Sequence, residues 1–183
     1  MKEILLSLAR ASIADVVGVG YELDLDTLLE TNLWLQEEGA SFVTITIDNG
    51  QLRGCIGSIV AHRKLYEDII YNAKSAAIND PRFNKLTKDE FNRIRIEVSL
   101  LSEPKILKYS SIEDLKAKIQ IGIDGVILKN GANQATFLPQ VWEELSTFEL
   151  FFSHLCQKAG LDNKCLSLTP EIYIYQVEKY KEI

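Results

Sequence analysis

A chain of 183 residues with 46% hydrophobic and 25% charged residues has an ordinary globular composition, which excludes a disordered or low-complexity chain. Its formal net charge of -6 opposes attraction to phosphate backbones and anionic lipid, so neither nucleic acid nor a membrane surface is expected as a partner. No apolar stretch is long enough to span a bilayer, and the opening segment predicts an amphipathic helix and not a signal peptide.

Hydrophobic periodicity and turn residues predict an α+β fold with a mixed or antiparallel sheet packed with helices. In chain order, the predicted elements are helices at 5–17 and 27–36, strands at 42–47 and 52–58, a helix at 65–78, a short capped helix at 87–91, a strand at 95–100, a helix at 111–119, strands at 125–128 and 134–138, a long helix at 139–160 and a strand at 172–177. The length of 183 residues predicts one compact unit, with or without a small appended lobe.

The cysteines bear on the cellular compartment and on metal binding. Cys55, Cys156 and Cys165 cannot all pair within one chain, and they lack the density of a secreted disulfide framework. A reducing, cytoplasmic environment is therefore expected. His154 and Cys156 are two residues apart, so on a helix their side chains point apart and match no standard zinc pattern. No metal site is predicted, and the sequence does not identify a cofactor.

The strands on either side of Asn49-Gly50 form a predicted hairpin, since this dipeptide is typical of a two-residue turn. Such a turn fixes the register of the two strands. The pairs that it predicts are Asp48 with Gln51, Ile47 with Leu52, Thr46 with Arg53, Ile45 with Gly54, and Thr44 with Cys55. Arg53 and Cys55 then share one face, and Gly54 makes a notch in the other. That second, apolar face is expected to contain Val43, Ile45, Ile47, Leu52 and Ile56.

Cys55 is the candidate nucleophile of this hairpin, because an arginine two residues away on the same strand face can stabilise its thiolate form. Gly54 and Gly57 bracket it, and without Cβ atoms they allow a ligand or another backbone to approach closely. In the alternative interpretation, Cys55 is a small apolar core residue, Arg53 is a surface ion-pair partner, and the glycines mark a bulge. These residues alone leave both interpretations open.

Glu97, Asp80 and Arg82 are the other charged candidates. Glu97 lies on the polar face of its predicted strand and is expected opposite Arg53, either in a structural ion pair or as a general acid-base. Asp80 and Arg82 flank Pro81 in a predicted loop. They form either a pair that stabilises the loop or a substrate-holding site, in which the guanidinium binds an anion through two hydrogen bonds.

Several further motifs accompany the hexapeptide at 52–57, in the order found in one known family. They are Asn72-Ala73 with Ala76-Ala77, Asp80-Pro81-Arg82-Phe83, Glu97-Val98-Ser99, Asp124-Gly125-Val126, Phe137-Leu138-Pro139-Gln140-Val141-Trp142 and Lys158-Ala159-Gly160. On these motifs the chain resembles the AMMECR domain family, called AmmeMemoRadiSam system protein A in prokaryotes. The resemblance implies one AMMECR-type domain at 1–183, with a larger lobe built from both chain ends and a smaller lobe from the middle.

The resemblance also implies a crevice near the hexapeptide and a pathway shared with Memo-like and radical SAM proteins, but no known reaction. Two functional hypotheses follow. An enzyme would use Cys55 as nucleophile on a small molecule or in a protein modification, with Glu97 or Asp80 moving protons. A non-catalytic binding or scaffold partner would hold a ligand in the same crevice. The candidate binding residues are Arg53, Gly54, Gly57, Asn72, Asp80 and Arg82.

Overall fold

The computed structural model describes residues 1–183, and these fold into two compact units. Unit 1 consists of Met1–Leu101 and Glu178–Ile183, and unit 2 consists of Ser102–Val177. Each unit has its own hydrophobic core. The expected α+β class, with a larger lobe from both chain ends and a smaller lobe from the middle, is therefore confirmed. No helix is long and apolar enough to cross a membrane.

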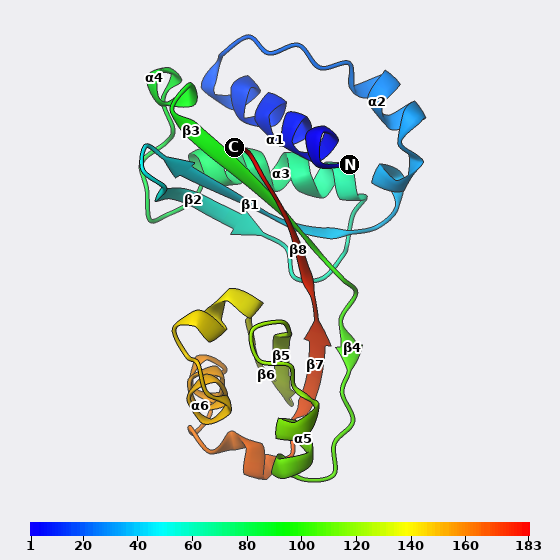
Figure 1. Cartoon of the computed structure of the whole chain (residues 1–183), viewed down its shortest axis with the longest axis vertical. Coiled ribbons are helices and arrows are strands. Elements are labelled where there is room, and N and C mark those ends of the chain that lie inside the picture. Colours follow the sequence, from blue (N-terminus) through cyan, green and yellow to red (C-terminus); the bar gives the residue numbers. More distant parts are fainter. The chain divides into compact units, whose positions relative to one another are not determined.

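Unit 1 is a four-stranded sheet with two long helices on one face. Its elements are α1 (Lys2–Val17), α2 (Leu25–Thr31), η1 (Leu33–Gln36), β1 (Ala40–Ile47), β2 (Gln51–Gly57), α3 (Leu65–Ile78), α4 (Lys88–Phe91), β3 (Ile94–Leu101) and β8 (Val177–Lys181). The strand order is β2-β1-β3-β8, and β1 pairs antiparallel with both β2 and β3. Helices α1 and α3 pack together against this sheet (Figure 1).

Alternation along the strands explains which face the helices cover. Val43 and Ile45 of β1 and Ile96 of β3 are fully buried in the core of unit 1. Their neighbours along the strands, Thr44 on β1 and Arg95 and Glu97 on β3, are not part of that core. A strand turns successive side chains to opposite faces, so one face of the sheet supplies the core and the other carries the polar residues. The helix α1 ends as predicted, because Gly18 adopts the left-handed conformation that terminates a helix (φ 74°).

The predicted helix at 27–36 is wrong in one respect, because it is divided into α2 and the 3-10 helix η1. Asn32 lies at the division with a non-helical φ of -132°. Its side-chain amide donates to the carbonyl of Leu28 at 2.9 Å and its side-chain oxygen accepts from the Trp34 indole at 3.3 Å. Asparagine competes with the backbone for such bonds, which is why it interrupts an otherwise helical pattern.

Unit 2 contains the second sheet, in the strand order β4-β7-β5-β6. Its elements are β4 (Lys105–Ile106), α5 (Ile112–Lys118), β5 (Gly125–Asn130), β6 (Asn133–Phe137), η2 (Pro139–Glu143), α6 (Phe148–Lys158), η3 (Cys165–Leu168) and β7 (Glu171–Tyr175). All three strand pairs are antiparallel. The predicted long helix at 139–160 is wrong, because η2 and α6 are separate. Thr147 caps α6 by accepting a hydrogen bond from the Leu150 N–H at 3.3 Å.

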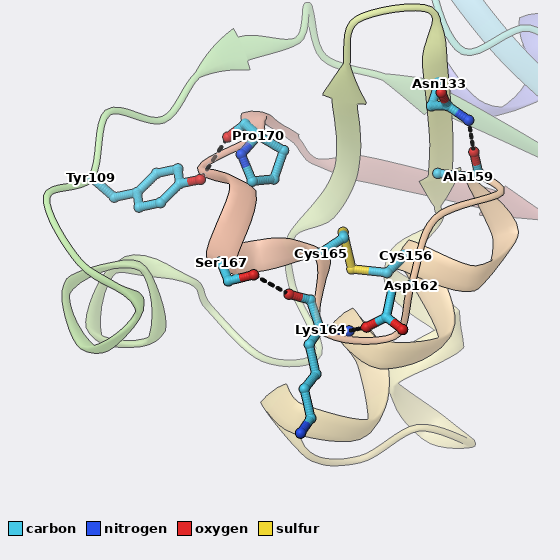
Figure 2. The surroundings of a disulfide bond; sticks show 9 residues. All are labelled: Tyr109, Asn133, Cys156, Ala159, Asp162, Lys164, Cys165, Ser167 and Pro170. Atoms are coloured by element: carbon cyan, nitrogen blue, oxygen red, sulfur yellow. Dashed lines mark hydrogen bonds between the residues drawn. A yellow bond between two sulfur atoms is a disulfide. The ribbon is translucent and has the colours of Figure 1, made fainter.

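A disulfide joins Cys156 at the end of α6 to Cys165 at the start of η3, with 5.7 Å between their Cα atoms (Figure 2). Both residues lie in the core of unit 2. Neither Cys156 nor Cys165 therefore carries a free thiol, and Cys55 is the free cysteine. The cysteine count could not show this pairing, because it depends on the turn after α6, where Asp162 accepts from the Lys164 N–H at 2.9 Å (Figure 2).

Candidate functional site

The hairpin between β1 and β2 has a three-residue turn, Asp48-Asn49-Gly50, and a β-bulge. Asp48 and Gly50 have positive φ, and the Gly50 N–H donates to the Ile47 carbonyl at 3.2 Å. Beyond the bulge, the predicted pairs Thr44–Cys55 and Ile45–Gly54 are confirmed, but the three predicted pairs nearest the turn are wrong. The observed pairs there are Thr46 with Leu52 and Ile47 with Gln51. The extra residue in the turn shifts the strand pairing by one position and the bulge shifts it back, so the predicted register holds again from Gly54 onwards.

The bulge changes the surroundings of Leu52 and Arg53. Leu52 is 43% exposed and does not join the apolar face that was predicted for it. The Arg53 side chain, which is 12% exposed, bends to Glu90. Its Nε lies 2.8 Å from Glu90 Oε1 and its Nη2 lies 3.0 Å from Oε2. The expected position of Glu97 opposite Arg53 is therefore wrong.

Glu90 is held by both Arg53 and the start of α4. The Thr87 N–H donates to Glu90 Oε2, as expected for a capped helix start, and the Thr87 hydroxyl donates to the same oxygen. The Arg53 guanidinium, followed by the hydrogen bonds from Thr87, lowers the pKa of Glu90 to about 2. Arg53 also donates to the carbonyls of Asn84 and Lys85. Arg53 therefore fixes the segment before α4, and its charge is balanced by a carboxylate.

The two glycines of the hexapeptide are sites of close packing. A Cβ atom at Gly54 would lie 2.1 Å from the carbonyl oxygen of Ala76 in α3. A Cβ atom at Gly57 would lie 2.1 Å from the ring of Phe42. The predicted notch at Gly54 is confirmed, and the backbone of α3 fills it. A role of Gly54 and Gly57 in binding a substrate stays a prediction.

Asp80 and Arg82 bind the two backbone polar groups of Cys55. The Asp80 carboxylate accepts from the Cys55 N–H at 2.9 Å, and Arg82 Nη2 donates to the Cys55 carbonyl at 3.3 Å. Arg82 also binds Asp80 through two nitrogens, at 2.7 and 3.0 Å. Because β2 is an edge strand, this clamp occupies polar backbone groups that would otherwise lack a partner. We call these contacts the Asp80–Arg82 clamp.

The clamp also determines the charge state of Asp80. Its side chain is 2% exposed, and burial alone would favour the neutral form. The hydrogen bonds from Arg82, and then that from the Cys55 N–H, outweigh burial and hold the pKa of Asp80 well below its usual range. Asp80 is therefore a bound carboxylate at neutral pH. The interpretation of Asp80 and Arg82 as a structural pair accounts for these contacts.

The thiol of Cys55 lies on the sheet face away from α1 and α3, because Gly54 faces α3 and successive residues alternate. Thr44, opposite Cys55, donates its hydroxyl to the sulfur at 3.3 Å. Thr44 also pairs with Glu97 on β3. Cys55, Thr44 and Glu97 thus form one row across β2, β1 and β3. We call this side of the sheet the thiol face; it also contains Phe42, Thr46, Arg95 and Ser99.

Asn72, another candidate binding residue, lies on the opposite side of the sheet in a buried polar network. Its side-chain amide donates to the Ser41 carbonyl at 3.0 Å and to Asp68 at 2.9 Å. Asp68, which is fully buried, also accepts from the Ser41 N–H and the Ser58 hydroxyl. The network ties α3 to the ends of β1 and β2. The structure therefore does not bring Asn72 to the thiol.

Sequence reasoning missed three residues of this site: Thr44 as the partner of the thiol, Glu90 as the partner of Arg53, and Asp68 in the polar network. Thr44 could have been found, since its pairing with Cys55 was predicted and a hydroxyl opposite a thiol can donate to it. Glu90 lies in the predicted short capped helix at 87–91, and its sequence position gives no sign of a pair with Arg53. Asp68 gave no signal, because a carboxylate on an amphipathic helix is usually solvated.

The comparisons with known proteins place this geometry in a family. The AMMECR1 family model matches residues 6–180. A protein of Methanosarcina mazei is 36% identical over 98% of this chain and 85% of its own length. Protein SSO0193 of Saccharolobus solfataricus is 37% identical over 88% of this chain and 72% of its own length. The crystal structure of the uncharacterised protein PH0010 from Pyrococcus horikoshii superposes with a TM-score of 0.83, at 33% identity, over 98% of this chain and 90% of that one. The chain therefore belongs to the AMMECR1 family.

Proposed function

We propose that this protein is a thiol-dependent enzyme in which Cys55 attacks an electrophilic carbon of a small molecule or of a protein that it modifies. The observation that carries the proposal is the immobilisation of Cys55. The Asp80–Arg82 clamp fixes both its backbone N–H and its carbonyl, while the residue is half-buried and its sulfur is bound by one hydroxyl. A nucleophile gains from being held in one orientation by its surroundings.

The hydroxyl of Thr44 supports the proposed chemistry. The thiolate is the nucleophilic form of cysteine, and a hydroxyl that donates to the sulfur can hold it in place as it attacks. Thr44 is part of β1, between β2 and β3, so its position is fixed by strand pairs on both sides. This contact involves no arginine, and it therefore differs from the role that the sequence suggested for Arg53.

Glu97 is the residue on this face that we assign to proton transfer. Asp80 and Glu90 both have lowered pKa values and are bound to arginines, so neither accepts a proton readily at neutral pH. Glu97 is half-buried in the same row as Cys55, and it has no ion-pair partner. In the proposed step, the Glu97 carboxylate takes up the proton that the Cys55 thiol releases, and the sulfur, which accepts the Thr44 hydrogen bond, forms a bond to a carbonyl carbon. The π electron pair of that carbonyl moves to its oxygen, which receives the proton back from Glu97.

The test is the rate at which iodoacetamide alkylates Cys55 in the native protein at neutral pH, read by peptide mass spectrometry. We expect Thr44→Val and Glu97→Gln to slow labelling, whereas Thr46→Val, one row away on the same strand, should leave it unchanged. Mass spectrometry of the intact protein should also detect an adduct retained by wild type and absent from Cys55→Ser. A Cys55 that is inert, or that reacts equally in all variants, contradicts the proposal.

A non-catalytic role is the second candidate, and the ion pairs favour it. Arg53 and Arg82, which a catalytic site could use, are both committed to structural carboxylates. In this role the thiol face would bind a ligand or protein for Memo-like and radical SAM enzymes, as the family resemblance suggests, in the cytoplasm that the cysteine usage predicts. Cys55→Ser separates the two: a binding module keeps its partner and function, whereas the enzyme keeps binding but loses turnover.

A further inference from the structure

Arg95 is the one arginine of the chain that forms no ion pair with a carboxylate. The chain has six arginines, and five of them form ion pairs with carboxylates; these five are Arg10, Arg53, Arg63, Arg82 and Arg93. Arg95 is exposed, and its guanidinium donates a hydrogen bond to the carbonyl of its neighbour Ile94 at 3.2 Å. In a chain with 26 acidic residues and a net charge of -6, an arginine without a carboxylate partner is exceptional.

The position of Arg95 relates it to Cys55. Arg95 pairs with Thr46 across β1, and Glu97 two residues later pairs with Thr44. Arg95 is therefore on the thiol face, in the row next to that of Cys55, Thr44 and Glu97. From strand geometry, its Cα lies about 10 Å from Cys55 across the sheet and about 7 Å along it. The long arginine side chain covers part of that distance, and a small ligand can span the rest.

The other two arginines near Cys55 cannot bind an anionic ligand without losing a structural contact. Arg53 is bound to Glu90, and Arg82 is bound to Asp80. Glu97 shares the face with Arg95, but the two side chains are not joined. A guanidinium that is accessible and lacks a counter-ion is suited to a carboxylate or a phosphate, which it binds through two parallel hydrogen bonds.

We infer that the substrate of the Cys55 site carries a carboxylate or phosphate group, which Arg95 binds while the electrophilic carbon lies at the sulfur. This inference rests on the proposed function of Cys55 and adds the charge class of the substrate. It assigns specificity to Arg95 and reactivity to Cys55 and Thr44. The two assignments can therefore be tested by different variants.

The test compares two alkylating reagents that differ in charge. With iodoacetate or iodoacetamide, the sulfur displaces iodide and forms the same S–CH₂ bond, and the thiol proton is released; only iodoacetate carries a carboxylate. We expect Arg95→Gln to lower the ratio of the iodoacetate rate to the iodoacetamide rate by about three- to fivefold, as for an exposed ion pair. Arg95→Lys should retain part of the ratio. The control is Arg93→Gln, which removes a charge that Asp48 already balances.

Inorganic phosphate gives a second readout. In wild type it should slow labelling by iodoacetate, and in Arg95→Gln this protection should be lost. If both reagents label Cys55 but neither the ratio nor the protection depends on Arg95, the anion inference is wrong while the proposed function stands. If neither reagent labels Cys55, the proposed function fails and the inference fails with it.

Discussion

The Asp80 carboxylate accepts a hydrogen bond from the backbone N–H of Cys55 at 2.9 Å, although the two residues are 25 positions apart in the chain. The loop after α3 therefore sets the position of the residue that carries the thiol. In the second half of the clamp, Arg82 binds both the carboxylate and the Cys55 carbonyl. Two side chains of one short loop thus act in place of a neighbouring strand at the edge of the sheet.

Asp80→Asn should destabilise unit 1 and disturb the thiol. The substitution preserves shape but removes the charge that binds Arg82, and hydrogen bonds to a charged group contribute about 1.5 to 3 kcal/mol. We expect a loss of about 2 kcal/mol in urea unfolding and slower alkylation of Cys55. Asp48→Asn is the matched control, since its pair with Arg93 is exposed and contributes less than about 1 kcal/mol. Equal losses in the two variants would contradict a special role for the clamp.

The stability of unit 1 should fall in acid because of Asp80 and Glu90. Both carboxylates have lower pKa values in the folded state than in the unfolded chain, so the unfolded state binds protons first as the pH falls. The contribution of Glu90 is complete above its ordinary pKa of 4.5 and is lost progressively as the pH falls towards its folded value of about 2. The pKa of Asp80 is held lower still, so its contribution is lost over a more acidic range. Urea unfolding across this range measures the effect. Glu90→Gln should be less stable at neutral pH but lose less on acidification; an unchanged pH profile would contradict this assignment.

Gly54→Ala should lower the melting temperature clearly. The added Cβ would lie 2.1 Å from the Ala76 carbonyl, which is backbone and cannot turn away, so β2 and α3 must separate. Overpacking of this kind typically costs about 1 to 3 kcal/mol, and we expect the upper part of that range. Gly20→Ala is the control, because nothing lies within 4 Å of the added atom there. Wild-type stability in Gly54→Ala would mean that α3 does not pack on β2 as described.

The sequence predicts elements well where one periodic pattern covers the whole element. The helix predicted at 65–78 is α3, and the strand predicted at 95–100 lies within β3. Predictions fail where a single polar side chain interrupts a pattern, as Thr147 does between η2 and α6. Apolar spacing continues through that point, so periodicity alone cannot show that a new helix begins.

The site is less predictable than the fold, because its contacts depend on register. The dipeptide Asn49-Gly50 indicates a turn, but it does not show that Asp48 joins the turn and that a bulge follows. One added residue moves a side chain to the other face, and Arg53 consequently reaches Glu90 instead of Glu97. The prediction for Cys55 is correct, because the predicted register holds from Gly54 onwards and Cys55 pairs with Thr44.

The disulfide between Cys156 and Cys165 should stabilise unit 2 by about 2 to 3 kcal/mol, since it closes a short loop with a sequence separation of 9. Trp142 reports on this unit, because its ring is stacked on Phe151 of α6 at 3.6 Å. With Trp34→Phe, Trp142 is the sole tryptophan, and its fluorescence follows unfolding of unit 2 in urea. Reductant should lower the midpoint of this transition.

Two variants show whether that effect belongs to this disulfide. Both variants are built on Trp34→Phe. The Cys156→Ala/Cys165→Ala variant should unfold at a lower urea concentration, and reductant should not change its midpoint. In Cys55→Ala, reductant should lower the midpoint as it does in the parent. Peptide mapping without reductant should recover the peptides of residues 156 and 165 as one linked species and Cys55 as the free thiol. A midpoint that reductant does not move would show that the loop from α6 to η3 is held by core packing alone, with both sulfurs acting as buried apolar atoms.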